Sequence, residues 1–159
     1  MEKVIATLCD FFEREVPCLN ETYKWKTPNI NGFPQSGQSG YGATLAFKKF
    51  IKENWDSASS QEEKIRLAKI IVANWGGVRS NNSETLIGYV NAVSEIEPPT
   101  PLRGIASYSK IYSIVRPEEF SIYDARVAAC LNAIQVNAGL EKGLAFNYIP
   151  GRNNIVGNN

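Results

Sequence analysis

The chain has 159 residues, of which 43% are apolar, enough for one domain with its own hydrophobic core. Its 17 basic and 16 acidic residues give a net charge of +1, so any DNA-binding surface would have to come from local placement of charge. Histidine is absent, which excludes Ser-His-Asp and Cys-His catalysis and histidine-based metal sites.

Apolar residues recur at helical spacing in residues 2–16, which predict a helix that Pro17 ends. Residues 20–42 are rich in Gly, Asn, Gln, Ser and Pro and have no period, so they predict a long polar loop. Residues 43–55 predict a second helix. Its polar side carries Lys48, Lys49 and Lys52. These lysines either contact phosphate or simply form a solvated face.

A third helix is expected from Ser59 or Ser60 to Trp75. Each serine precedes a glutamate by three residues, which is a capping-box pattern. Gly76 and Gly77 follow the helix and supply a C-cap. Residues 83–96 predict a fourth helix.

The last third of the chain begins with a proline-rich break at 97–101. Three further helices are expected, within 102–115, from Asp124 through Val136, and over 139–147. Arg116-Pro117 ends the first of them, and Asp124 is a good N-cap for the second. Residues 148–159 predict a polar tail without a terminal cap, which favours a natural chain that continues further. The sequence therefore predicts a mainly α, compact multi-helix fold, with residues 1–159 as one helical domain.

The cysteines and the chain start indicate a reduced, cytoplasmic protein. The three cysteines, Cys9, Cys18 and Cys130, form no CxxC pair, so no structural zinc site is expected. The first residues read as an amphipathic helix with acidic residues, not as a signal peptide. No run of eighteen apolar residues is present, so no membrane partner is expected. We expect no metal and no cofactor.

Lys110 and Asp124 lie on either side of the predicted Arg116-Pro117 turn. A lysine attacks carbon only as the neutral amine, and a partly desolvated site favours that form. A nearby carboxylate could shuttle protons and stabilise a cationic, sugar-like transition state. In the simpler interpretation Lys110 is a solvated helix lysine and Asp124 only a cap. That is the commoner situation for one lysine and one aspartate fourteen residues apart.

The stretch SYSKIYSIVRPEEFSIYDARVAACLN at 107–132 resembles the catalytic segment of the helix-hairpin-helix DNA glycosylase superfamily. It is most similar to the 8-oxoguanine DNA glycosylase-like proteins of bacteria and phage. The resemblance implies the compact helical fold of that superfamily, with Lys110 as nucleophile and Asp124 as the catalytic aspartate. It also implies DNA contacts by four residues, Arg126, Arg103, Gly104 and Ser107. The segment NWGGVRSNN at 74–82 is similar to these proteins too, without an assigned role.

The resemblance implies a DNA base-excision glycosylase, with or without AP lyase activity, acting on duplex DNA that contains a damaged base such as an oxidised purine. The nucleotide would be flipped into a pocket, where Lys110 attacks the sugar and leaves a Schiff base. Aromatic faces are expected around the base, with Tyr108, Tyr112 and Trp25 as candidates. Ordinary core packing explains these aromatic residues equally well.

The alternative function is a non-catalytic helical module that binds DNA or a protein partner, for instance in a phage-related or defence system. The near-neutral charge favours it, as does the predicted hairpin at 102–107, which has one glycine where the family has several. The Lys110–Asp124 arrangement favours the enzyme.

Overall fold

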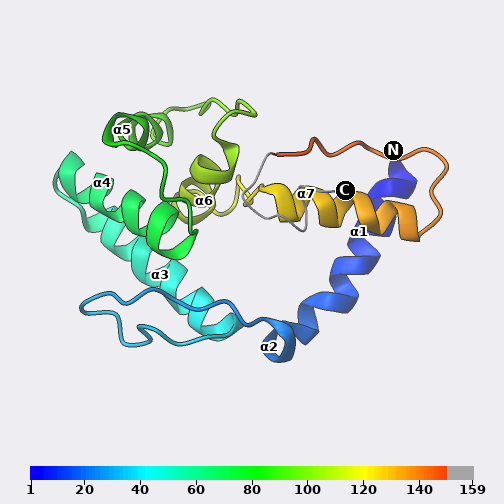
Figure 1. Ribbon diagram of the computed structural model, residues 1–159, viewed down its shortest axis with the longest axis horizontal. Coiled ribbons are helices and arrows are strands. Elements are labelled where there is room, and N and C mark those ends of the chain that lie inside the picture. The colour runs from blue at the N-terminus through cyan, green and yellow to red at the C-terminus, as the bar shows by residue number, and fades with distance from the viewer. Residues whose placement is uncertain (150–159) are drawn as a thin grey trace. The chain divides into compact units, whose positions relative to one another are not determined.

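A computed structural model describes residues 1–149, and these form helices and no strands, which confirms the expected mainly α fold (Figure 1). The chain divides into two compact units. We call Met1–Leu19 with Tyr123–Asn159 the terminal unit, and Asn20–Ile122 the central unit. Each is described by itself. The predicted polar tail lies outside the described residues from position 150 onward.

The terminal unit is built on two helices that pack against each other, α1 (Glu2–Glu15) and α7 (Ala125–Asn137), as Figure 1 shows. Pro17 ends α1 as expected, but the chain then makes a short 3-10 turn at Val16–Cys18. The four-residue helix α2 (Leu19–Thr22) follows it. The predicted polar loop thus begins after this helical turn.

The short helix expected over 139–147 is wrong, because this segment is not helical. The side-chain amide of Gln135 donates to the Leu144 carbonyl at 2.9 Å and accepts from the Leu144 N–H at 2.7 Å. The Asn132 amide makes the same pair of bonds with Phe146, at 2.9 and 3.0 Å. These two α7 side chains satisfy backbone groups that a helix would pair internally, so the segment is not helical.

The central unit contains the remaining helices. They are α3 (Tyr41–Ser57), α4 (Gln61–Lys69), the π-helix η2 (Ile70–Trp75), α5 (Ser83–Ala92) and α6 (Ile105–Val115). The capping box of α4 is confirmed: Ser60 and Glu63 bond each other's backbone N–H groups. α6 packs against α3, η2 and α5, so it lies at the centre of this unit's core. The fourth helix ends at Ala92, four residues earlier than expected.

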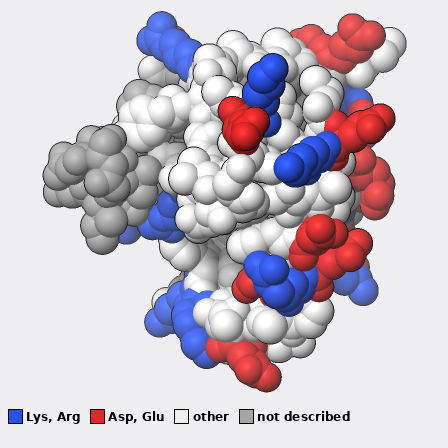
Figure 2. Space-filling model, turned by 90° about the vertical axis from the view of Figure 1, so that its right-hand side faces the viewer, with Lys and Arg blue, Asp and Glu red and all other residues white. Residues whose placement is uncertain are grey.

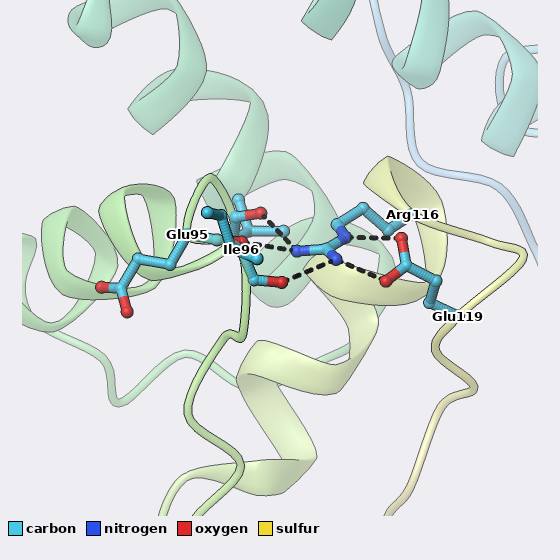
Figure 3. Close-up of polar contacts among 5 residues, drawn as sticks. Glu95, Ile96, Arg116 and Glu119 are labelled. Atoms are coloured by element: carbon cyan, nitrogen blue, oxygen red, sulfur yellow. Dashed lines mark hydrogen bonds and ion pairs between the residues drawn. The ribbon is translucent and has the colours of Figure 1, made fainter.

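Arg116 ties the connection between α5 and α6 to the end of α6 (Figure 3). Its guanidinium donates to the Glu95 carbonyl at 2.7 Å and to the Ile96 carbonyl at 3.3 Å. It also donates to both carboxylate oxygens of Glu119, at 2.8 Å for Oε1. We call this set the arginine clasp. From the sequence, Arg116 was expected only to end the helix.

The arginine clasp predicts a specific pH dependence of stability. The hydrogen bond from Arg116 holds the pKa of Glu119 below its ordinary value of 4.5. A carboxylate with a lowered pKa adds stability that is present above the ordinary pKa and lost as the pH falls through the lowered one. The free energy of unfolding of Glu119→Gln should therefore fall less steeply than that of the wild type below pH 4.5. Urea denaturation at a series of pH values measures both slopes.

Glu118→Gln is the matched control, because Glu118 is adjacent but outside the clasp. Its slope should follow the wild type. Equal slopes for the wild type and Glu119→Gln would contradict the clasp's contribution.

Candidate lysine site

The connection that precedes α6 ends at a glycine. Gly104 is the N-cap of α6 and has φ +84°, a left-handed conformation that favours glycine. A methyl group there would also collide with the Tyr89 hydroxyl. The neighbouring Arg103 is exposed, as a DNA contact requires. Gly104 is thus needed both for the turn and for the close approach of Tyr89.

Lys110 lies on α6 and is buried, with only 6% of the residue exposed. Its amine donates a hydrogen bond to the Ala106 carbonyl, one turn earlier. Its aliphatic stem packs against Gly76: a Cβ atom built on Gly76 would lie 2.6 Å from Lys110 Cδ. Ser109 and Ser113 beside it are also buried. Lys110 is therefore not the solvated helix lysine of the simpler interpretation.

The end of the π-helix packs behind Lys110, in the NWGGVRSNN segment at 74–82 that had no assigned role. The Gly76 N–H donates to the Ile71 carbonyl, five residues earlier, at 2.9 Å. The preceding carbonyl, of Trp75, accepts from the Trp25 indole N–H at 3.1 Å. Asn81, further along the same segment, donates to the buried hydroxyl of Ser107 at 2.8 Å. Trp25 and Lys110, both predicted from the sequence, thus contact the same dipeptide, Trp75-Gly76.

Gly76→Ala should disturb this site directly. The new methyl group would meet Lys110 Cδ and also the backbone carbonyl of Val72, at 2.9 Å, which cannot move as a side chain can. We expect a loss of about 1–3 kcal/mol in the free energy of unfolding, the usual cost of overpacking. Chemical denaturation measures it.

Gly88→Ala serves as the control, because a Cβ atom at Gly88 meets nothing within 4 Å. Alanine is the better helix former, so this variant should be as stable as the wild type or more so. Equal stability of Gly76→Ala and the wild type would show that Lys110 is not packed against Gly76.

Tyr108 and Tyr112 are core residues, buried in the hydrophobic cluster of the central unit. Their hydroxyls donate to the carbonyls of Pro101 and Pro99, at 2.7 and 3.4 Å. Burial raises the pKa of Tyr108 to about 12. Both tyrosines thus stabilise the connection before α6 through hydrogen bonds to two of its proline carbonyls. Of the three predicted pocket aromatics, Trp25 is the one that is partly exposed.

The terminal unit holds the other two predicted residues. Asp124 caps α7 as expected: its Oδ1 accepts from the backbone N–H groups of Arg126 and Val127, at 3.0 and 3.2 Å. The Arg126 side chain is exposed. Lys110 belongs to the central unit and Asp124 to the terminal unit, so each is placed within its own unit.

Function could also depend on metal-binding clusters, membrane-spanning helices, charged patches or hollows among the described residues. Within residues 1–149, no three Cys, Asp or Glu side chains are grouped so that they could hold a metal ion. None of the helices there has both the length and the apolar character that crossing a bilayer requires. Basic and acidic side chains are interspersed on the face drawn in Figure 2. A hollow of about 400 Å³ lies between the start of α4 and the end of α5, and one of about 560 Å³ lies between α1 and α7. None of the predicted site residues lines either hollow.

Comparison with known proteins assigns no relative to this chain. No protein-family model, no curated protein and no solved structure matches it.

Proposed function

We propose that this chain is a DNA base-excision glycosylase, with or without AP lyase activity, in which Lys110 is the nucleophile. The observation that carries the proposal is the burial of Lys110 behind the turn that starts α6. Lysine is rarely so buried, and a desolvated lysine reaches the neutral, nucleophilic form more easily. The substrate would be duplex DNA with a damaged base, an oxidised purine being the first candidate.

The proposed reaction begins with the target nucleotide outside the helical stack. The neutral Lys110 amine forms a bond to the anomeric carbon, and the bond from that carbon to the base breaks. The base leaves with the electron pair and takes up a proton. The carboxylate of Asp124 would stabilise the positive charge that develops on the sugar.

The attached amine then loses a proton, the sugar ring opens, and a Schiff base links Lys110 to the sugar. Water can hydrolyse this link and release an abasic site. Alternatively, loss of a proton from the neighbouring sugar carbon expels the 3′ phosphate and cuts the strand. The second route is the AP lyase activity.

The second candidate is the non-catalytic helical module that binds DNA or a protein partner. It is supported by the contacts of Lys110 themselves, because a purely structural lysine could also bond to Ala106 and pack on Gly76. The interspersed charges in Figure 2 also suit a protein partner.

Reductive trapping distinguishes the two candidates. The protein is incubated with duplexes that carry 8-oxoguanine, uracil or an abasic site, then treated with borohydride. A glycosylase with a Schiff-base step gives a covalent protein–DNA adduct, and peptide mass spectrometry should place it on Lys110. Binding without an adduct on any duplex would remove the enzyme proposal and leave the module.

A further inference from the structure

The three lysines on the polar side of α3 have different surroundings. Lys49 is 79% exposed at its side chain and lies 3.9 Å from a Glu53 carboxylate oxygen. Lys52 bonds to Asp56 Oδ1 at 2.7 Å. Lys48 has neither an ion pair nor a side-chain hydrogen bond among residues 1–149. From the sequence the three lysines form one set, whereas in the structure Lys48 differs from the other two because it has no carboxylate partner in the described part of the chain.

Lys48 is half-buried, and its ammonium lies 5.8 Å from the centre of the Trp75 ring. Burial lowers the pKa of its amine. A contact of this kind offsets only part of the cost of removing a cation from water. A half-buried cation without a counter-charge therefore favours an anionic ligand.

Two further polar groups near Lys48 have no hydrogen-bond partner. The indole N–H of Trp75 is buried without an acceptor. The hydroxyl of Thr44, one turn before Lys48 on α3, is also buried and unpaired. Such orphan groups are rare in folded proteins and often mark functional sites. Both atoms are covered by protein, so Lys48 is the member of this group that can reach a ligand.

The position of Lys48 links it to the candidate nucleophile. The Lys48 ammonium lies over the ring of Trp75, and the next residue, Gly76, packs against Lys110. We propose that the Lys48 ammonium contacts a DNA backbone phosphate beside the nucleotide that Lys110 attacks. This inference rests on the proposed function. A phosphate is favoured over the base because a phosphate carries a full negative charge, and Lys48 has no other counter-charge beside it among the residues that the structure describes.

The salt dependence of DNA binding tests this contact. A duplex with a tetrahydrofuran abasic analogue is titrated by fluorescence anisotropy over a series of salt concentrations. Each phosphate neutralised by a protein cation contributes about 0.9 to the slope of log K against log salt. Lys48→Gln should reduce that slope by about this amount, whereas Lys48→Arg should keep it. Lys49→Gln, on the same helix, is the matched control and should change the slope less.

A single neutral methylphosphonate, moved through the phosphates around the analogue, locates the contact. One position should weaken wild-type binding and leave Lys48→Gln without further loss. If Lys48→Gln keeps the wild-type slope while folding normally by circular dichroism, the phosphate contact is wrong. Equal losses for both proteins at every methylphosphonate position would also overturn it.

Failure of this inference is distinguishable from failure of the proposed function. A borohydride adduct on Lys110 together with an unchanged slope for Lys48→Gln would leave the glycosylase and remove the Lys48 contact. A reduced slope without any adduct would leave Lys48 as a phosphate contact and remove the glycosylase chemistry. A wild-type protein that does not bind the duplex would overturn both.

Discussion

Lys110→Gln is expected to abolish the borohydride-trapped adduct and to lower single-turnover base excision by about three orders of magnitude or more. The reason is chemical: a glutamine amide cannot attack the sugar carbon or form a Schiff base. Excision of the base from an 8-oxoguanine, uracil or other damaged duplex measures the rate, and gel electrophoresis after borohydride measures the adduct. An adduct that survives in Lys110→Gln would show that another amine is the nucleophile.

Because Lys110 is buried, its replacement also needs a folding control. Lys110→Met keeps most of the stem that packs against Gly76 and removes only the amine. We expect it to unfold at the same denaturant concentration as the wild type or higher, because a buried amine no longer has to be accommodated. Lys49→Gln, in an exposed ion pair, should keep wild-type excision. Loss of activity in Lys110→Met with normal stability would thus separate chemistry from folding.

Asp124→Asn is expected to lower the excision rate by about 10²–10⁴, the usual contribution of a positioned acid–base group, while leaving the fold intact. Asparagine caps helices as well as aspartate does, so the bonds to the Arg126 and Val127 N–H groups can be retained. Only the negative charge is lost. Excision kinetics and chemical denaturation of the same sample measure the two effects separately.

Asp124→Ala is the companion variant, because it removes the cap as well as the charge. It should cost about 1 kcal/mol in the free energy of unfolding, in addition to the loss of activity. If Asp124→Asn excises the base at the wild-type rate, Asp124 is only a helix cap. That result would leave the Lys110 chemistry without its proposed carboxylate.

The features predicted correctly from the sequence are those set by neighbouring residues. The Ser60–Glu63 capping box and the Asp124 cap each need a side chain and backbone groups within three residues. The larger helices were predicted from the spacing of their apolar residues, which is also a property of residues close together in the chain. The resemblance drew attention to Lys110, and its assignment as nucleophile remains a prediction.

Features set by residues far apart in the chain were missed. The contact between Gly76 and Lys110 joins positions 34 apart, and nothing in the local pattern of either announces it. The arginine clasp likewise needs carbonyls about twenty residues before Arg116. The segment over 139–147 was predicted as a helix, but the side-chain amides of Asn132 and Gln135, on α7, bond to its backbone groups instead. The unassigned NWGGVRSNN segment and its paired glycines were a signal that this part of the chain matters, but they do not identify Lys110 as the residue that packs there.

The π-helix before Gly76 has a consequence for recognising related chains. A π-helix is an α-helix that has accepted one additional residue, and the widened turn absorbs it without changing the direction of the flanking helix. Each residue of an ordinary helix advances by about 100°, so the insertion decides which side chain faces α6 at its end. In an alignment we expect a one-residue gap within Ile70–Trp75 to mark chains that no longer present a Trp-Gly pair to the lysine helix. Such a gap would distinguish chains with this lysine site from helical relatives that share only the fold.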